Sequence, residues 1–391
     1  MDDKTKKMKI IRVCTHDISL GGLLKGQLAF LNQHFEVVGL SADTGQLQQV
    51  AEREGIRVIE VPMHREIALG ADWKCLWQLR RIFRQERPDV VHANTPKGSL
   101  LSMIAARMAG VKSRVYLVTG LRYQGASGMG RFILKNMERI TCFFASKVIP
   151  EGEGVKRILQ KDHITRKPLE VVHHGNINGI DTQYFSREAT VSKHGTREQV
   201  REKLGLTPDD FAFVFIGRMA HDKGMHELAE ATRTLKKNYP HLRIILVGRF
   251  EQNLDPIPEE DKDFFEHDEA VRFVGYQTDV RPFLLAADAL AFPSFREGFP
   301  NVVMQAGAMS LPLLVTDISG CTDIVTDGEN GIVIPPRDAQ ALTEKMEYLM
   351  LHPEVCRKMA EAARPSITSR YEQKDVWQAL LKMYNSLNEK K

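Results

Sequence analysis

Residues 211 to 224 read FAFVFIGRMAHDKG, and this stretch decides the fold class. Its first six residues are apolar, and most are aromatic or β-branched, which is typical of a strand buried on both faces. A glycine, an arginine and a lysine follow, and then an amphipathic stretch begins. A buried strand, a glycine-containing loop and a helix in succession form part of a βα unit, the building block of a parallel sheet.

The same alternation repeats along the chain. Short apolar runs predict strands in the first half at 10–14, 37–40, 58–61, 90–92, 115–118 and 171–173. The pattern then restarts, with strands expected at 211–216, 244–247, 271–274, 289–292, 313–315 and 332–334. Longer helix-like stretches separate these runs, and 73–85 is one of them. The pattern predicts an α/β protein with two doubly wound parallel-sheet domains, covering residues 1–184 and 185–371.

A terminal helix is expected after the second domain. Apolar residues recur there at i, i+4, i+7 and i+11, which places them on one helix face: Val376, Leu380, Met383 and Leu387. Such a face needs an apolar surface to cover. We expect residues 372–391 to pack on the first domain.

Composition excludes several classes of protein. The 391 residues are 43% apolar and 27% charged, which is inconsistent with a disordered chain or a disulfide-rich mini-protein. The five cysteines are scattered without a CxxC pair, so we expect reduced thiols in a cytosolic compartment: Cys14, Cys75, Cys142, Cys321 and Cys356. The sequence shows neither a signal-peptide pattern nor an apolar run of about 18 residues, and we expect a cytoplasmic protein.

The net charge of +4 hides an asymmetry between the two halves. Residues 1–180 carry +11 and residues 181–391 carry −7. A solvated surface explains such a pattern equally well, but attraction to an anionic membrane surface or lipid phosphate is the functional alternative. The residues expected to dock on lipid head groups or on an acceptor's diphosphate are Arg107, Lys112, Arg114, Arg122, Arg131 and Lys135. No aromatic-interleaved basic stretch indicates nucleic-acid binding.

Candidate ligand-binding residues follow the strands, because ligands of open parallel sheets bind at the carboxyl ends of strands. In the first half, Gly21 and Gly22 follow the first strand and are expected to open a helix whose N-terminal backbone N–H groups bind an anion of the donor, although an ordinary tight turn would look the same. The ends of the fourth and fifth strands supply four more polar candidates. One is His92, and the other three, Thr95, Lys97 and Arg122, are expected to bind the acceptor. A structural, hydrogen-bonded histidine is the alternative for His92.

In the second half, Arg218 ends a strand and Lys223 precedes a helix. Two fixed cations there could clamp a diphosphate and supply the charge that a metal ion would otherwise bring, although surface cations are the alternative. Gly217 and Gly248 stand at strand ends where a ligand could approach the backbone.

The stretch 292–306, FPSFREGFPNVVMQA, is the most specific cluster. Pro300 is expected near the first position of a helix, whose N–H groups would face an anion. Gln305 lies one turn beyond Asn301 on the same side. Glu297 beside an anion makes sense if it accepts hydrogen bonds from hydroxyl groups, so the site suggests a sugar nucleotide.

Together these motifs resemble the retaining GT-B glycosyltransferases of family 4, which build capsular polysaccharide, O-antigen and glycans on polyprenyl diphosphate. The resemblance covers nearly the whole chain and is carried by residues 21–22, 92–97, 176–181, 217–224, 293–305, 316–321 and 327–331. It implies two Rossmann-like domains that face each other across a cleft, the first for the acceptor and the second for the nucleotide sugar.

The resemblance also implies roles for individual residues. Arg218 and Lys223 would hold the nucleotide diphosphate, Glu297 would contact the donor sugar, and His92 would act in catalysis or contact the sugar. Support for phosphate and sugar would come from Gly298, Phe299, Pro300 and Asn301. The chain departs from the family pattern at two positions. Gln305 replaces a glutamate that usually holds the ribose hydroxyls, and Asn94 stands where many relatives carry a histidine.

The expected activity is transfer of a sugar, with retention, from a nucleotide-diphosphate donor to a saccharide or polyprenyl-diphosphate-linked acceptor. Uridine is the expected base by family habit. No metal or other cofactor is expected, because no DxD stands at a strand end. The enzyme could work peripherally at the inner face of the plasma membrane. A sugar-nucleotide epimerase or a catalytically weak sugar-nucleotide-binding homologue would show the same motifs, whereas the lack of GxGxxG disfavours a nicotinamide-dependent dehydrogenase.

Overall fold

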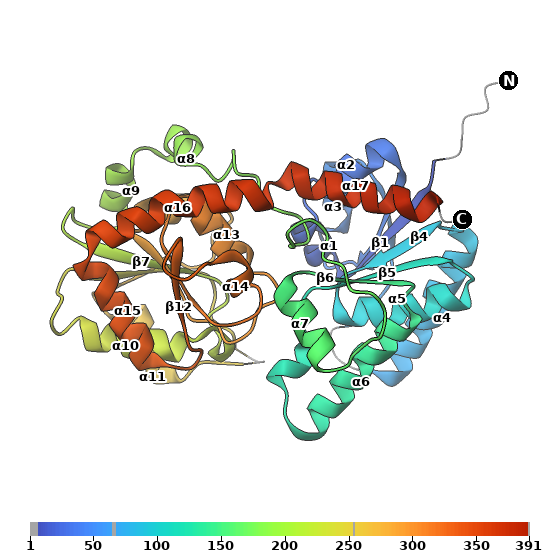
Figure 1. The fold of residues 1–391 in the computed structure, drawn as a ribbon, viewed down its shortest axis with the longest axis horizontal. Helices are drawn as coiled ribbons and strands as arrows, with labels where there is room; N and C mark the ends of the chain where they lie inside the picture. The colour runs from blue at the N-terminus through green and yellow to red at the C-terminus, as the bar shows by residue number, and fades with distance from the viewer. Residues whose placement is uncertain (1–6, 65–67, 253–254, 390–391) are drawn as a thin grey trace. The chain divides into compact units, whose positions relative to one another are not determined.

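The computed structural model describes residues 7–64, 68–252 and 255–389, and it divides into two compact units (Figure 1). Unit 1 comprises Met1–Gly179 and Gln373–Lys391, and unit 2 comprises Ile180–Glu372. These boundaries differ by a few residues from those expected after residues 184 and 371. Residues 180–182 belong to unit 2 because the Ile180 N–H donates to the Tyr371 carbonyl at 2.8 Å and the Thr182 hydroxyl donates to Glu372.

Unit 1 is built on a six-stranded parallel sheet of order β3-β2-β1-β4-β5-β6. The strands are β1 Lys9–His16, β2 Glu36–Ala42, β3 Arg57–Glu60, β4 Val90–Ala93, β5 Ser113–Val118 and β6 Lys147–Pro150. The first five agree with the predictions, but the strand expected at 171–173 is wrong and β6 takes its place. His173 has a φ of 55°, a left-handed conformation that cannot continue an extended strand.

The helices of unit 1 include α17, which comes from the far end of the chain. They are α1 Asp17–Leu23, α2 Gln27–His34, α3 Leu47–Glu54, α4 Leu69–Glu86, α5 Pro96–Met108, α6 Gly128–Phe144, α7 Glu153–Lys161 and α17 Gln373–Glu389, with a 3-10 turn η1 at Arg122–Gly125. Helix α17 lies along α2 (Figure 1). It buries Val376, Leu380, Met383 and Tyr384 in one hydrophobic cluster with the apolar side of α2. The expected return of the terminal helix to the first domain is therefore confirmed.

Unit 2 repeats the architecture with the strand order β12-β11-β10-β7-β8-β9. Its strands are β7 Phe211–Ile216, β8 Leu242–Val247, β9 Val271–Phe273, β10 Ala289–Phe292, β11 Leu313–Thr316 and β12 Gly331–Ile334, in agreement with all six predictions. Its helices are α8 Arg187–His194, α9 Arg197–Lys203, α10 Met225–Leu235, α11 Glu259–His267, α12 Arg281–Ala286, α13 Asn301–Ala308, α14 Cys321–Ile324, α15 Ala339–Leu351 and α16 Pro353–Tyr371, with a 3-10 turn η2 at His221–Lys223. Strand order reverses between β7 and β10, where such sheets bind ligands.

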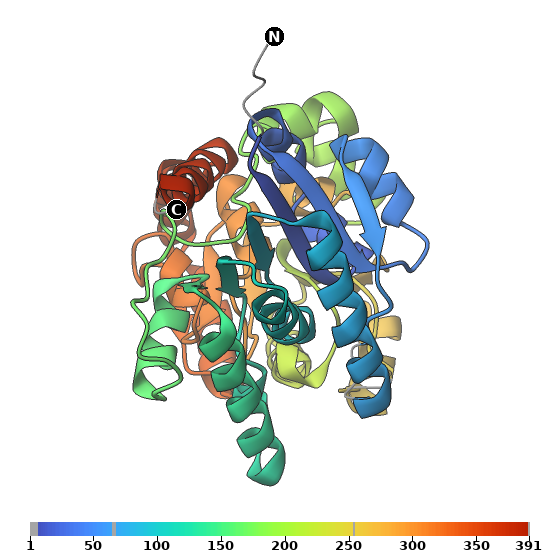
Figure 2. The same cartoon turned by 90° about the vertical axis from the view of Figure 1, so that its right-hand side faces the viewer.

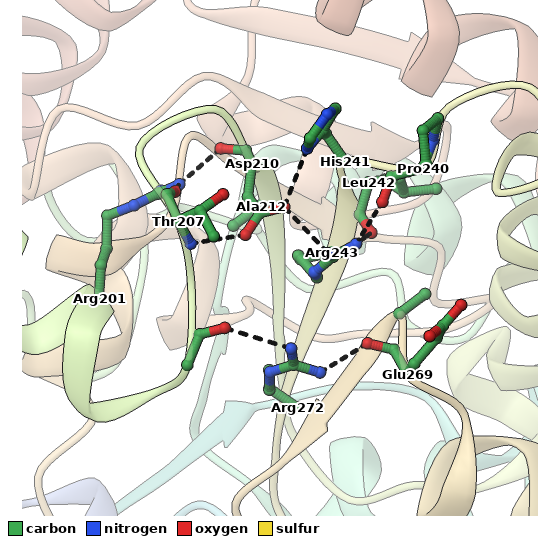
Figure 3. Close-up of polar contacts among 12 residues, drawn as sticks. Arg201, Thr207, Asp210, Ala212, Pro240, His241, Leu242, Arg243, Glu269 and Arg272 are labelled. Atoms are coloured by element: carbon green, nitrogen blue, oxygen red, sulfur yellow. Dashed lines mark hydrogen bonds and ion pairs between the residues drawn. The ribbon is translucent and has the colours of Figure 1, made fainter.

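A polar cluster fixes the amino ends of β7, β8 and β9 (Figure 3). The Asp210 carboxylate, which is buried, accepts a hydrogen bond from the Thr207 N–H at 2.7 Å and lies 3.1 Å from Arg243 Nη2. Arg201 donates to the carbonyls of Thr207 and Asp210, and Arg272 donates to the Leu204 carbonyl at 2.9 Å. These contacts tie the loop before β7 to the neighbouring strands, at the end of the sheet opposite the ligand-binding edge.

The cysteines are free thiols, and four of the five are buried, as is typical of cysteines that pack as small apolar core residues. Burial raises the pKa of the Cys14 thiol to about 11. Among the described residues, no helix combines the length and the apolar character needed to cross a membrane.

Candidate functional site

Unit 2 contains a cavity of about 490 Å³ at the carboxyl ends of β7, β8 and β9. Its walls come from residues 216–218 at the end of β7, residues 247–249 at the end of β8, residues 276–280 after β9, two side chains of α13, and Tyr184 and Phe185. Four residues singled out from the sequence line this cavity together: Gly217, Arg218, Gly248 and Gln305. Loops that are far apart in the sequence thus meet at one edge of the sheet, as the strand-end rule requires.

Gly248 shows how closely two of these loops approach. A Cβ atom built on Gly248 would lie 1.8 Å from the carbonyl oxygen of Gly217, and the φ of Gly248 is 152°. No other residue fits this position without moving the backbone. The glycine therefore keeps the ends of β7 and β8 in contact at the cavity wall.

Arg218 is held at the cavity by acidic neighbours. Its Nη1 donates to Glu251 Oε2 at 2.7 Å, and its Nη2 lies 3.7 Å from Asp222 Oδ1. The side chain remains 43% exposed. The guanidinium is thus oriented by carboxylates and still open to a ligand, so it can contribute charge-assisted hydrogen bonds to a phosphate.

Lys223 and Glu297, which are 74 positions apart, form an ion pair. Lys223 Nζ donates to Glu297 Oε1 at 2.6 Å, and the Ser294 hydroxyl donates to the same oxygen at 3.0 Å. Both charged side chains are mostly buried. Gly224 allows this approach, because a Cβ there would lie 2.1 Å from the Pro293 carbonyl oxygen. The structure therefore joins the two clusters that sequence analysis identified separately.

The start of α13 differs slightly from its expected position. The helix begins at Asn301, so Pro300 occupies the N-cap position and Gly298 and Phe299 belong to the preceding loop. The Phe299 side chain is buried and contacts the Tyr371 ring, with 5.4 Å between ring centroids. Only the backbone of Phe299 can serve the site.

The sequence motifs did not identify residues 276–280 as part of the cavity, nor Tyr184 and Phe185. The Arg249 guanidinium lies 4.5 Å from the centre of the Tyr276 ring. The Arg281 guanidinium lies 3.6 Å from the centre of the Tyr184 ring. Hydrogen bonds from Arg281 hold the pKa of Asp279 far below its usual range. The signal for residues 276–280 was present, since this segment directly follows the strand expected at 271–274.

His92 in unit 1 does not reach a surface. It is fully buried, and its Nδ1 lies 2.5 Å from the Tyr384 hydroxyl of α17. Burial, with the charge of the buried Arg12 beside it, lowers the pKa of His92 well below its usual value. The structural reading of His92 fits this environment, and the suggested contact with substrate does not.

The paired glycines do not open a helix. Gly21 and Gly22 lie in the last turns of α1, which begins at Asp17, so the expected anion-binding N-terminus is wrong. A Cβ at Gly21 would lie 2.6 Å from Val50 Cγ2, and its carbonyl accepts a hydrogen bond from Arg53 at 2.7 Å. Gly21 is therefore needed for packing.

The expected acceptor residues are dispersed in unit 1. Thr95 is the N-cap residue of α5, and its Oγ1 accepts a hydrogen bond from the Thr15 N–H at 2.8 Å. Lys97 is buried and pairs with Asp72 at 2.6 Å, so its charge is compensated. Arg122 is exposed in η1. Within the described ranges, no three His, Cys, Asp or Glu side chains cluster so that they could hold a metal ion.

Comparisons with known proteins give a consistent result. The model of the "Glycosyltransferase Family 4" domain matches residues 28–184, and that of "Glycosyl transferases group 1" matches residues 196–366. The capsular polysaccharide biosynthesis glycosyltransferase CapM of Staphylococcus aureus is 30% identical over 384 residues, which cover 97% of this chain and 98% of CapM. A UDP-Gal:alpha-D-GlcNAc-diphosphoundecaprenol alpha-1,3-galactosyltransferase of Escherichia coli is 26% identical and covers 78% of each chain.

Solved structures show the same fold. Anabaena HepE in complex with UDP-glucose matches with a TM-score of 0.79 at 19% identity, over 97% of this chain and all of HepE. The WaaG glycosyltransferase, involved in lipopolysaccharide biosynthesis, matches with a TM-score of 0.73 at 18% identity, over 95% of this chain and 98% of WaaG. Two parallel-sheet units with this strand order are the GT-B architecture. The chain belongs to the family 4 glycosyltransferases, with a group 1 glycosyltransferase domain in its second half.

Proposed function

We propose that this chain transfers a sugar, with retention of configuration, from a UDP-sugar to a saccharide or a polyprenyl-diphosphate-linked acceptor in bacterial surface polysaccharide synthesis. The observation that carries the proposal is the cavity of unit 2, with Arg218 at its wall and the Lys223–Glu297 pair, which joins the loops after β7 and β10. CapM and the E. coli galactosyltransferase support the reaction class through the activities in their names.

The lining of the cavity suits a nucleoside diphosphate. Apolar walls of Ile216, Val247 and Val302, with the Tyr276 ring, offer a surface for a flat base. Gln305 can accept one ribose hydrogen bond and donate another. The complex of HepE with UDP-glucose supports a uridine donor for this chain.

In the proposed mechanism, the bond between the anomeric carbon and the diphosphate oxygen breaks while the oxygen of the acceptor hydroxyl bonds to the same face of the sugar. The proton of that hydroxyl passes to the departing diphosphate oxygen. Arg218 and Lys223 stabilise the negative charge that develops on the leaving diphosphate. Glu297 orients Lys223 and accepts hydrogen bonds from sugar hydroxyls. Because two cations are present, we propose that transfer requires no metal ion, so that chelation with EDTA leaves the rate unchanged.

Unit 1 is proposed to bind the acceptor and to meet the anionic inner surface of the plasma membrane. A lipid-linked acceptor, as in the name of the E. coli relative, would require access to a membrane. The excess positive charge of residues 1–180 favours contact with anionic lipids.

Turnover by cavity variants tests the proposal. Arg218→Ala and Lys223→Ala should each slow donor-dependent transfer by about 100-fold, a typical cost of removing one group that stabilises developing negative charge. Lys203→Ala, an exposed cation of α9, is the matched control and should leave the rate unchanged. Wild-type rates in both cavity variants would contradict the proposal, and conversion of the donor without any acceptor would instead indicate an epimerase.

A further inference from the structure

Helix α6 of unit 1 exposes an unusual apolar surface. Five of its large apolar side chains are between 44% and 76% exposed: Met129, Phe132, Ile133, Ile140 and Phe143. Their spacing of i, i+3, i+4, i+11 and i+14 places them on one face, an arc of about 100°. The opposite face buries Glu138, Thr141 and Cys142 against unit 1. Asn136 interrupts the apolar face, and its amide donates to the Phe132 carbonyl at 2.8 Å. Single exposed apolar residues are ordinary, but five on one face of an outer helix indicate a binding surface.

A row of positive charges runs along one side of α6, with Arg139 next to the apolar face and Arg131, at the other end of the row, on the opposite side of the helix. Arg131, Lys135 and Arg139 follow each other at intervals of four residues, so they form one row along the helix. The only acidic residue of α6 is Glu138, which is buried and accepts a hydrogen bond from the Tyr116 hydroxyl at 2.6 Å. Lys135 pairs with Asp162 at 3.2 Å, whereas Arg131 and Arg139 are exposed. The outward surface of α6 is therefore apolar and basic, without an acidic side chain.

A second cavity, of about 420 Å³, lies at the carboxyl end of α6. Arg107, Arg114 and Lys167 line it, together with the exposed Phe143 and the hydroxyl-bearing Ser146, and none of the described residues around it contributes a carboxylate. Carbonyl oxygens hold two of these cations in place. Arg114 Nε donates to the Phe144 carbonyl at 2.7 Å. Lys167 Nζ donates to the carbonyls of Cys142, Phe143 and Ala145, which use its three N–H groups, so Lys167 contributes charge rather than a hydrogen bond to an anion in this cavity.

The charge around this second cavity is not balanced by its neighbours. The carboxyl end of a helix carries the equivalent of only about half a negative charge, against three cations. Burial and the charge of Arg107 lower the pKa of Arg114, and burial and the charge of Arg114 lower that of Lys167. These cations repel one another across the cavity, so an anionic oxygen among them would be stabilised.

We propose that α6 docks unit 1 on an anionic phospholipid bilayer, with its apolar face among the acyl chains and a lipid phosphate in the cavity of Arg107, Arg114 and Lys167. An apolar helix face with cations beside it is the pattern of helices that lie in the membrane interface. Figure 2 shows α6 on the outside of unit 1, with one end extending past the other helices of that unit. The inference deepens the proposed function and rests on it for the lipid-linked acceptor that makes membrane contact useful.

Vesicle flotation with the full chain tests this inference. Wild-type protein should float with vesicles of phosphatidylcholine and phosphatidylglycerol but not with phosphatidylcholine alone. The double variant Phe132→Ser/Phe143→Ser and the charge reversal Arg107→Glu should each weaken binding to anionic vesicles by about tenfold or more. All three side chains are exposed, so the variants should fold.

Two matched controls separate this effect from general changes in hydrophobicity or charge. Leu351→Ser removes an apolar side chain that is 54% exposed in unit 2, and Lys203→Glu makes the same change in net charge there. Both should bind anionic vesicles like the wild type. Equal flotation of wild type and Phe132→Ser/Phe143→Ser, or equal binding to neutral vesicles, would overturn the inference.

Other outcomes would indicate a different partner for the α6 surface, or would distinguish failure of this inference from failure of the proposed function. A dimer that Phe132→Ser/Phe143→Ser converts to a monomer, with no vesicle binding by wild type, would overturn the inference in favour of self-association. Absence of vesicle binding in a wild-type protein that still turns over a UDP-sugar would overturn only this inference. Normal vesicle binding without any transfer activity would support the inference while contradicting the proposed function.

Discussion

At the scale of single residues, the ion pair between Lys223 and Glu297 is the feature on which the proposed chemistry depends most. The sequence motifs identified Lys223 and Glu297 separately. They could not predict the 2.6 Å contact between them, because the distance between the two loops depends on the packing of β7 beside β10. For His92, the sequence suggested a contact that the structure does not support. Its place at a strand end suggested a ligand contact, yet Tyr384, almost 300 positions away, covers it. A local motif contains no signal for such a partner.

Replacement of Glu297 by glutamine should mainly affect the chemical step. Glu297→Gln weakens the hydrogen bonds that the carboxylate accepts from the donor sugar, which UDP lacks, so we expect kcat to fall about tenfold or more while UDP affinity changes little. Steady-state kinetics and calorimetry with UDP measure the two effects. Glu329→Gln, at an exposed position of the same unit, is the control. A variant with the wild-type kcat would show that Glu297 has no role in transfer.

Gln305→Glu restores the glutamate that most members of the family carry at this position, and it tests whether residue 305 contacts the ribose. A carboxylate accepts hydrogen bonds from ribose hydroxyls more strongly than an amide does, so we expect UDP to bind about fivefold more tightly. Inorganic pyrophosphate, which lacks a ribose, should gain nothing. Equal or weaker UDP binding would mean that residue 305 does not contact the ribose.

At the scale of secondary-structure elements, α17 is an integral part of unit 1. The Tyr384 hydroxyl contacts both Arg12 Nη1, at 3.0 Å, and His92. Tyr384→Phe should therefore lower the free energy of unfolding of unit 1 by about 1–3 kcal/mol, because buried polar groups lose a partner. Urea denaturation measures this change. Tyr348→Phe in α15, where the side chain is more exposed, is the control and should cost little. Equal stability of wild type and Tyr384→Phe would contradict this role of α17.

The cluster around Asp210 in Figure 3 should make stability depend on pH. Burial raises the pKa of Asp210, but hydrogen bonds from Thr207 and the charge of Arg243 outweigh this and lower it below 3.8. A carboxyl group with a lowered pKa in the folded state stabilises the fold above its ordinary pKa and loses this effect as the pH falls through the lowered value.

Asp210→Ala should therefore lower the free energy of unfolding by about 2 kcal/mol at neutral pH, and the difference from wild type should shrink below about pH 4. Urea denaturation over a pH series measures it. The exposed neighbour Asp209 provides the control, because Asp209→Ala should change little at any pH. A difference for Asp210→Ala that grew at acid pH would contradict the assigned sign.

Elements differ in how well their sequence predicts them. The strands of unit 2 are continuous apolar runs followed by loops, so all six could be predicted. Strand β6 has only four residues and ends at Pro150, which makes its signal weak. In α6, the sequence revealed an excess of cations but not the docking surface, because only packing determines that Phe132 and Phe143 face outward while Glu138 is buried.

At the scale of the whole molecule, the two units divide the work that the account assigns to the chain. Unit 2, whose residues 181–372 lie in the acidic half, contains the cavity with Arg218 at its wall and the Lys223–Glu297 pair, and the basic unit 1 carries the α6 surface. The charge asymmetry of the sequence thus coincides with a division into units, but net charge alone did not locate either site. Both sites depend on loops that converge at the ends of strands and helices.

Calorimetric titration of UDP into the full chain, with EDTA present, tests the central claim most directly. We expect UDP to bind wild type saturably in EDTA. In Arg218→Ala and in Lys223→Ala, the affinity for UDP should fall at least tenfold, which corresponds to roughly 1.4 kcal/mol or more. Lys203→Ala should bind UDP like the wild type. If wild type failed to bind UDP, or if Arg218→Ala and Lys223→Ala both bound UDP as tightly as wild type, the assignment of the unit 2 cavity to the donor would be contradicted.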